Sequence, residues 1–487
     1  MKTRSLALLA AATLASAQAL AGCAVGPDYS RPSAPVSAAF KEAEGWVPAA
    51  PADQLSRGPW WELFGDPTLS GLVARVEVSN QNVIAAEAAY RQAQAMVAQQ
   101  RAGLFPTVDL SGGGTRSGGG SRSGGGSSVV NPDGTVTTIG GGRGSGTTYR
   151  VSLAASWTPD VWGRIRRGIE GARAGAEASA ADLAAATLAA QGELVADYFG
   201  LRQADAEIAL DDATVEGYRR SLQIAQNQYA AGVAARSDVL QAQTQLDGAL
   251  ADLEGARQQR ATYEHAIAVL VGEAPGNFSL AAQADWSLAP PAIPPGTPST
   301  LLQRRPDIAA AERRMAAANA DIGVQTAAFF PDLSLSGSYG FAGGELGGLF
   351  GASNSLWSLG VSAAETLLDF GARGARVRGA RAAYDQAVAQ YRQTVLQALQ
   401  DVEDRLAASR VLDRQAALRQ DASASADMAE QMMLNRYQVG QVSYVEVVTA
   451  QTSAYSARRA VLQARVQQLS TAAALIQALG GGWNAGS

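Results

Sequence analysis

The sequence predicts a mixed α+β membrane protein that is internally duplicated and contributes four strands per chain to an assembly. Three observations predict this fold class: motifs that recur at constant spacing, four segments that alternate apolar and polar residues, and long proline-free stretches with apolar residues every seven positions. The 487 residues carry a formal charge of −5 and no basic run, which argues against nucleic acid as a partner.

The duplication is visible in two sets of motifs. Tyr229-Ala-Ala-Gly232 returns as Tyr437-Gln-Val-Gly440, with the two glycines 208 positions apart. Phe105-Pro106 returns as Phe330-Pro331 after 225 positions. A repeat of this length is far longer than a solenoid unit, so it indicates two copies of one large structural half. The change in spacing places a longer loop in the first copy.

The amino terminus has the pattern of a processing signal. Lys2 and Arg4 precede an apolar stretch that ends in Leu20-Ala21-Gly22-Cys23, and this pattern resembles the bacterial lipobox. We therefore expect a signal peptide at residues 1–22 and acylation of Cys23; the alternative is an ordinary secretory signal that contains a cysteine. No later segment has the eighteen or so apolar residues of a membrane helix, so any membrane crossing is left to strands.

The two halves are expected to contain the same elements. Residues 23–60 are rich in Pro and Ala and predict a lipidated tether with little regular structure. The first repeat covers residues 61–272, with a helix from about Pro67 to Arg101, a strand hairpin at 104–158, a long helix to about Ala231 and a return helix. A Pro-rich linker at 273–298 precedes the second repeat at 299–480, whose strand hairpin spans 330–367, and a tail at 481–487. The Gly/Ser tract at 111–146 is expected to be a flexible loop.

Helix length and strand number then suggest the assembly. The long helix of the first repeat would extend on the order of 100 Å at 1.5 Å per residue, and its heptads call for partner helices. Four strands cannot close a barrel, and a sheet in lipid must leave no unpaired edge, so the chain is either soluble or assembles with other copies to complete one barrel. The secretion signal, the alternating strands and the heptads favour assembly. Three chains of four strands form the smallest cyclic barrel that leaves an open channel.

Several runs resemble those of a known family. They are Gly296 to Glu312, which contains Arg304-Arg305-Pro306-Asp307-Ile308, together with Phe329-Phe330-Pro331, Leu20 to Pro32, Trp60 to Pro67, Asp160 to Arg164 and Asp369-Phe370-Gly371. These runs resemble the TolC-type outer membrane factor family, in its NodT-like branch of efflux lipoproteins, and cover nearly the whole mature chain.

The resemblance implies a trimeric, twelve-stranded outer membrane β-barrel that continues into a long periplasmic α-helical barrel with a mixed belt at its equator. It also implies a passive exit channel of a tripartite pump that exports small molecules. The partners would be two further copies of the chain, a periplasmic adaptor protein, an inner membrane transporter and the lipid of the outer membrane.

The residues indicate no enzyme, cofactor or metal site. The only histidine, His265, is expected to be a packed or surface residue of a return helix. The Gly-rich tract lies between two strands and does not precede a helix, so it lacks the geometry of a phosphate-binding loop. The cluster of Met428, Met432 and Met433 is typical of core packing rather than of a metal site.

The candidate functional residues lie at the helical tips, where Gly232 and Gly440 are expected to form the turns. From the resemblance, Val445 would form an apolar ring and Glu446 an acidic ring of a periplasmic constriction, with Asp238 at the matching place of the first copy. Thr449 stands where many relatives have Asp, and Val442 where some have Arg, which puts an ion-pair latch in doubt. Equally, Glu446 could serve only to begin its helix, where an acid favours the helix dipole.

A second hypothesis is a lipid-anchored periplasmic coiled-coil protein with a structural role. Such a tether requires no amphipathic strand hairpins at the ends of its long helices, so the strands distinguish the two hypotheses.

Overall fold

The computed structural model describes residues 24–34, 36–37, 39–42, 59–117, 128–130, 136–138, 146–291, 293 and 304–481. The predicted signal peptide, Cys23, residues 43–58 of the predicted tether and residues 292 and 294–298 of the Pro-rich linker lie outside the described residues. The chain divides into two compact units. The first contains residues up to 29, 95–173 and 317–384, and the second contains residues 30–94, 174–316 and 385–487.

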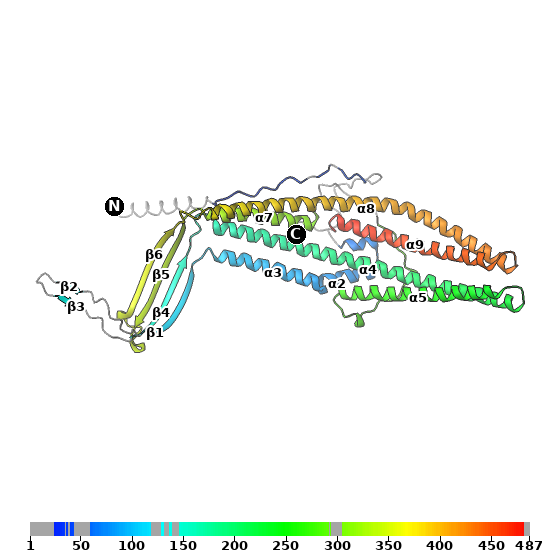
Figure 1. Ribbon diagram of the computed structural model, residues 1–487, viewed down its shortest axis with the longest axis horizontal. Helices are drawn as coiled ribbons and strands as arrows, with labels where there is room; N and C mark the ends of the chain where they lie inside the picture. Colours follow the sequence, from blue (N-terminus) through cyan, green and yellow to red (C-terminus); the bar gives the residue numbers. More distant parts are fainter. Residues whose placement is uncertain are drawn as a thin grey trace. The chain divides into compact units, whose positions relative to one another are not determined.

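The first unit contains a four-stranded antiparallel sheet. Its strands are β1 (Thr107–Ser117), β4 (Gly146–Trp157), β5 (Asp332–Gly343) and β6 (Ser355–Ala364), in the order β1-β4-β5-β6 (Figure 1). The two predicted strand hairpins are confirmed, and the pairing of β4 with β5 joins them. Among the described residues, β1 and β6 are each paired on one side only.

The Gly/Ser tract is more ordered at its ends than expected. β1 continues through Gly112, Gly113 and Gly114, because its backbone pairs with β4 as far as Gly146. Two short strands, β2 (Ser128–Val130) and β3 (Val136–Thr138), also pair within the tract. The backbone ladder therefore extends through positions where side chains give no strand signal.

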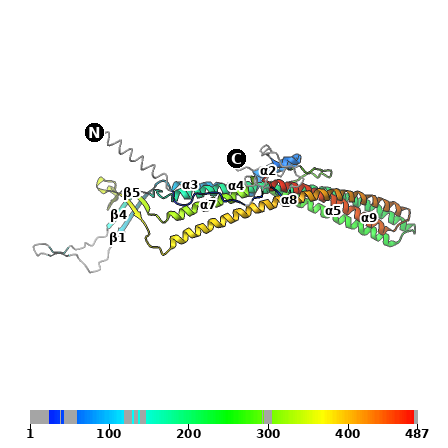
Figure 2. The ribbon, with the colours of Figure 1, turned by 90° about the horizontal axis from the view of Figure 1, so that it is seen from above.

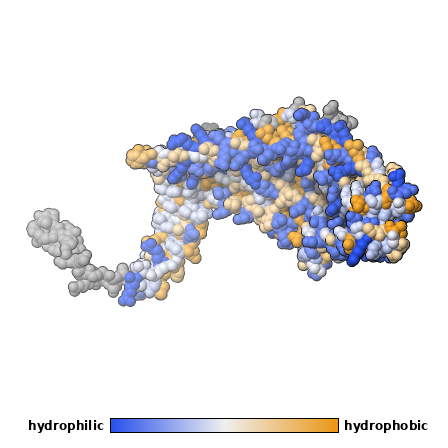
Figure 3. Space-filling model, turned by 45° about the vertical axis from the view of Figure 1, so that its right-hand side comes forward, coloured by the Kyte–Doolittle hydropathy of each residue, from blue (hydrophilic) through white to orange (hydrophobic). Residues whose placement is uncertain are grey.

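The two faces of the sheet differ sharply in polarity. One face carries exposed apolar side chains from all four strands, among them Val108, Leu110, Leu153, Tyr339, Trp357, Leu359 and Val361. The other face carries hydroxyl pairs across the strands, with oxygens 2.7 Å apart in Ser334–Ser362 and 2.9 Å apart in Ser111–Ser152. In the space-filling view the surface of the strands is mostly pale and orange (Figure 3). An amphipathic sheet with apolar residues exposed is suited to lipid on one side and water on the other.

The helices confirm the duplication residue by residue. The long helices α4 (Arg164–Ala230) and α8 (Ala372–Gln438) each have 67 residues, and the return helices α5 (Arg236–Leu270) and α9 (Tyr444–Ala478) each have 35. The helices that precede the strand hairpins, α3 (Gln81–Ala102) and α7 (Pro306–Ala327), each have 22. The α4–α5 and α8–α9 hairpins lie side by side (Figure 2).

The first expected helix is broken in two. α2 (Pro67–Ser79) begins with Asp66, whose carboxylate accepts the backbone N–H groups of Thr68 and Leu69, and ends before Asn80. The Asn80 side chain then accepts the N–H groups of Asn82 and Val83 and donates to Leu270 O at 2.9 Å. Asparagine prefers such a capping role to a place within a helix, so the break at Asn80 corrects the prediction of one continuous helix.

Short 3₁₀ helices complete the described secondary structure: η2 (Trp60–Phe64), η3 (Pro275–Asn277), η5 (Leu346–Gly348) and η6 (Ala352–Asn354). None of the described helices is both long enough and apolar enough to cross a membrane.

The amino-terminal segment has no helix or strand in its described part, yet several of its described residues are hydrogen-bonded to the helices. In the first unit, Arg167 donates to Asp28 at 2.8 Å, and Val25 donates its N–H to Trp162 O at 3.1 Å. In the second unit, Glu403 accepts the Lys41 N–H at 2.7 Å. The described part of the expected tether is therefore bound to the helices through Val25, Asp28 and Lys41.

Candidate functional site at the helical tips

Both helical hairpins turn at a glycine with left-handed backbone geometry. Gly232 has a φ of 73° and Gly440 a φ of 72°. At the first turn Val233 donates its N–H to Gln228 O, and at the second Gln441 donates to Arg436 O, each at 2.9 Å. This six-to-one hydrogen bond after a left-handed glycine is the Schellman ending of a helix. The prediction that Gly232 and Gly440 form the turns agrees with this geometry.

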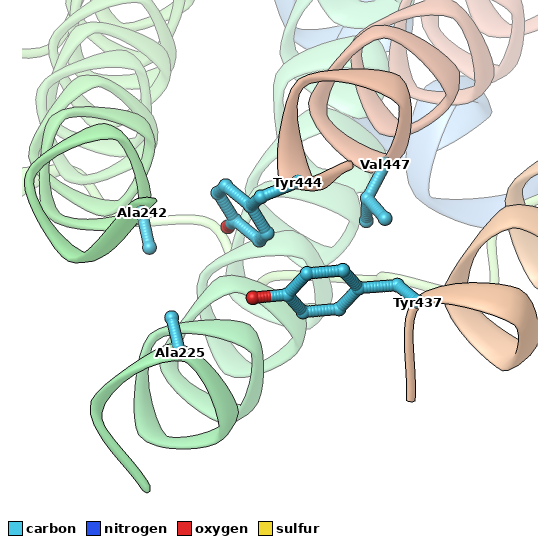
Figure 4. Close-up of a cluster of buried hydrophobic side chains, with 5 residues drawn as sticks. All are labelled: Ala225, Ala242, Tyr437, Tyr444 and Val447. Atoms are coloured by element: carbon cyan, nitrogen blue, oxygen red, sulfur yellow. The ribbon is translucent and has the colours of Figure 1, made fainter. Parts of the chain in front are cut away.

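A hydrophobic cluster joins the two tips. Tyr437, Tyr444 and Val447 from the second hairpin pack against Ala225 and Ala242 from the first, and all five are buried (Figure 4). The two tyrosine rings are 5.2 Å apart between centroids, at an interplanar angle of 57°. The small alanines of the first hairpin leave the space that these two rings fill.

The tyrosine hydroxyls lie in a poorly hydrated environment. The Tyr437 hydroxyl is buried and has no hydrogen-bond partner among the described residues. Desolvation raises the pKa of Tyr437, and the negative charge of Asp238 raises it further. Desolvation also raises the pKa of Tyr444 well above its ordinary value. Both phenols are therefore neutral at physiological pH, and Asp238 is close enough to the cluster to act on both.

The predicted constriction residues of the second hairpin lie together at the start of α9. Val445 is 53% exposed, and Glu446 and Thr449 are also exposed. The Glu446 carboxylate accepts the Ser443 backbone N–H at 2.8 Å and the Ser443 hydroxyl at 3.0 Å, which forms a capping box. The Thr449 hydroxyl donates to Val445 O at 2.9 Å. Glu446 thus caps α9 while its side chain stays at the surface, so capping and a place on the constriction are compatible.

The matching positions of the first hairpin are built differently. Ala235 occupies the place of Ser443 and provides no side-chain cap for α5. Asp238 occupies the place of Glu446, and its carboxylate accepts a hydrogen bond from the Ser237 hydroxyl at 3.2 Å. It is partly buried, and its negative charge contributes to the raised pKa of both Tyr437 and Tyr444.

Sequence reasoning missed a polar ladder between α4 and α9. Gln451 donates to the Ser221 hydroxyl at 3.1 Å, and the Tyr455 hydroxyl donates to Asp211 at 2.8 Å. One turn further along, Arg459 approaches Glu207 at 3.5 Å. Tyr455 also lies at the seven-residue spacing of Leu462 and Leu469, which predicts apolar packing. The spacing of four residues from Gln451 to Tyr455 to Arg459 was the signal for a polar stripe on one helix face.

The described residues contain no group of three or more His, Cys, Asp or Glu side chains that could hold a metal ion. His265 is exposed on α5; on α8 of the single chain Met428 and Met432 are exposed and Met433 is partly buried.

Comparisons with known proteins agree with this architecture. The family model described as "Outer membrane efflux protein" matches residues 72–273 and 297–481. The chain is 30% identical to the probable efflux pump outer membrane protein TtgC of Pseudomonas putida over 467 residues, which cover 95% of this chain and 93% of that protein. It is 31% identical to the solvent efflux pump outer membrane protein SrpC of Pseudomonas putida, with 96% of each chain covered.

Solved structures show the same fold. The outer membrane channel OprN superposes with a TM-score of 0.84 at 31% identity, covering 95% of this chain and all of that one. The open state of the Neisseria gonorrhoeae MtrE outer membrane channel gives a TM-score of 0.81 at 28% identity, covering 94% of this chain and 98% of that one. The predicted fold class is confirmed by these similarities together with the four-stranded sheet and the paired long helices.

Proposed function

Because this chain belongs to the outer membrane efflux protein family and is an outer membrane exit channel of an efflux pump, we propose that three copies of it enclose one passive duct. In this assembly twelve strands close into a barrel across the outer membrane, and the helices continue the duct into the periplasm. A periplasmic adaptor protein and an inner membrane transporter supply the cargo and the energy. Acylated Cys23 anchors each chain to the outer membrane.

The sheet is the observation that carries this proposal. Its apolar face is exposed on all four strands, its other face is lined with serine and threonine hydroxyls, and its outer strands β1 and β6 each lack a second neighbour among the described residues. An open sheet edge is not tolerated in lipid, so the sheet requires other chains to continue it. A structural tether has no use for such a sheet.

The cargo is selected elsewhere in the pump. Relatives of similar identity are named for toluene, solvents, antibiotics and cations. A channel whose sheet exposes small hydroxyl side chains on its polar face can pass all of these.

Conductance of the purified chain in a planar lipid bilayer tests the duct. We expect discrete conductance steps that increase when Val445 and Glu446 are both replaced by Ala, because the narrow end is then widened. A preparation of the same variant that never conducts, although it is folded by circular dichroism, would favour the coiled-coil tether.

We further propose that Val445, Glu446 and Thr449 form the narrow end of the duct, with Asp238 behind them. Three copies of Glu446 would place negative charge around the axis and favour cations. Glu446→Gln retains an oxygen that can accept the Ser443 N–H, so the cap persists while the charge is lost. We expect the cation preference of this variant to fall and that of Asp238→Asn to change little. An unchanged preference in Glu446→Gln would refute the acidic ring.

A further inference from the structure

An aromatic pair marks the junction between the two strand hairpins within one chain. Trp162, in the turn after β4, stacks on Phe330, which precedes β5, with ring centroids 4.9 Å apart and an interplanar angle of 23°. The Trp162 indole N–H donates to Pro331 O at 2.8 Å. The pair therefore lies where β4, the last strand of the first repeat, meets β5, the first strand of the second repeat.

The repeat assigns a counterpart to each ring. Shifting Trp162 by 208 positions gives Phe370, in the turn after β6, and shifting Phe330 back by 225 positions gives Phe105, which precedes β1. Phe370 is 94% exposed and Phe105 is 69% exposed. They belong to opposite edges of the sheet, so one chain cannot bring them together.

The backbone holds Phe370 in this exposed position. Its φ of 52° is the only positive φ of a non-glycine residue among the described residues, and the turn is fixed by Asp369, which accepts the N–H groups of Gly371 and Arg373. Left-handed geometry is rare for a bulky residue and often marks a contact site. Exposed Leu367 and Leu368 lie beside it.

We propose that Phe370 packs against Phe105 of a second copy of this chain and repeats, between subunits, the contact that Trp162 and Phe330 make within one. This contact rests on the proposed three-chain duct, because it requires β6 of one copy to lie next to β1 of the next. The phenylalanine side chain has no N–H to donate to the carbonyl of Pro106. The contact between subunits therefore lacks a counterpart of the hydrogen bond from Trp162 to Pro331 O.

The same shift predicts the register of the seam between subunits. Within the chain, Ala154 lies opposite Ser338 and Ser152 lies opposite Gly340. Applying the same shifts to these residues places Ser362 of one subunit opposite Gly113 of the next subunit. It likewise places Gly360 of one subunit opposite Thr115 of the next. Ser362 belongs to the hydroxyl-bearing face of β6, and Gly113 shares a face of β1 with Thr107 and Ser111. The faces of the two strands therefore match, as a continuous amphipathic sheet requires.

The closest backbone approach differs between the two seams. A Cβ on Gly340 would lie 2.5 Å from Val151 O, so the seam within the chain needs a residue without a side chain at this position. In the seam between copies the glycine is Gly360, on the other strand of the pair. Each seam thus has one glycine in this residue pair, but Thr115, the counterpart of Gly340, carries a side chain.

Chemical cross-linking tests the contact. In the full chain, Phe105→Cys combined with Phe370→Cys should be joined by a short bis-maleimide into dimers and trimers on a denaturing gel. The matched pair Trp162→Cys with Phe330→Cys should link only within one chain, and Phe105→Cys with Leu346→Cys, from the far end of the sheet, should not link copies. The unsubstituted chain controls for Cys23, its only cysteine.

Trimer stability gives a second measurement. Phe370→Ala should lower the association constant roughly 2- to 10-fold per contact, as expected for the loss of one aromatic pair. Phe370→Trp should restore or strengthen association, because it supplies the missing indole N–H, and Leu368→Ala should have less effect.

These experiments distinguish a failure of the Phe370–Phe105 contact from a failure of the three-chain duct. Intact, conducting trimers that give no cross-linked ladder and tolerate Phe370→Ala would overturn the contact and leave the duct in place. A chain that never forms trimers would overturn both.

Discussion

The tips of the two helical hairpins share a backbone but differ in their surroundings. Both turn at a left-handed glycine with the same hydrogen bond, and both carry a tyrosine three residues before it. Tyr437 of the second hairpin is 5% exposed, whereas Tyr229 of the first is 49% exposed. The two repeats thus have the same turn geometry, but they differ in the burial, helix capping and charge of the side chains around it.

The largest expected effect on stability distinguishes the buried ring of Tyr444 from the exposed ring of Tyr229. Tyr444→Ala should lower the free energy of unfolding by about 3–5 kcal/mol, because it removes a fully buried aromatic side chain from the cluster. Tyr229→Ala should lower it by less than about 1 kcal/mol. Chemical denaturation of both variants measures the difference, and equal losses would show that the tips are packed alike.

A charge difference along the long helices predicts a pH effect. Burial raises the pKa of Asp197 to about 6, and nearby Glu193 adds to the shift. The second half has Arg405 and Asp401 at the matching places. Since the folded state favours protonated Asp197, the free energy of unfolding should fall as pH rises from about 4 to about 6, by at most about 3 kcal/mol.

Asp197→Asn should remove this fall and make the protein more stable at pH 7. Denaturation of the unsubstituted chain and of Asp197→Asn at several pH values checks it. A pH profile that is unchanged in Asp197→Asn would assign the titration to another group.

The glycine turns should respond equally. Gly232→Ala and Gly440→Ala each force a Cβ into left-handed geometry, at an expected cost of about 1–2 kcal/mol. Open space surrounds both glycines, so no steric clash adds to this cost. Thermal unfolding of the two variants should give similar shifts; a much larger shift in one would show that the turns are not equivalent.

The helix caps should respond unequally. Glu446→Ala removes the acceptor of the Ser443 N–H and should cost about 1 kcal/mol. Asp238→Ala removes no such cap, so its effect should be smaller. Amide hydrogen exchange measures the change that each substitution causes in the first turn of its own helix. An acceleration in α5 of Asp238→Ala as large as that in α9 of Glu446→Ala would contradict this assignment of the cap.

The smallest expected effect concerns the buried Tyr437 hydroxyl. It has no partner among the described residues, so Tyr437→Phe should leave stability unchanged or raise it slightly. Tyr455→Phe is the matched control: it removes the hydrogen bond to Asp211 and should cost about 1–2 kcal/mol. A loss in Tyr437→Phe as large as in Tyr455→Phe would reveal a polar partner for Tyr437.

The sequence predicted the elements better than the contacts between them. Alternation at Trp357, Leu359 and Val361 located β6, and the recurrence of Gly232 as Gly440 located both turns, because periodicity and backbone geometry are local properties. The helix break at Asn80 was not predicted, because a single side chain causes it and does not change the periodic pattern of the sequence.

The candidate site was only partly predictable for a related reason. Burial of Tyr437 and exposure of Tyr229 depend on which hairpin packs against which, and the Tyr455–Asp211 hydrogen bond joins residues 244 positions apart. The motif Tyr-x-x-Gly is the same in both halves, so it contains no information about this difference.

The central claim is that three chains of two similar halves form one duct. Co-expression of a long-tagged and an untagged chain, followed by native separation of the assembled protein, counts the subunits directly. A trimer gives four species, with none, one, two or three tags per assembly. Two species would show a monomer and three a dimer, and either result would contradict the duct.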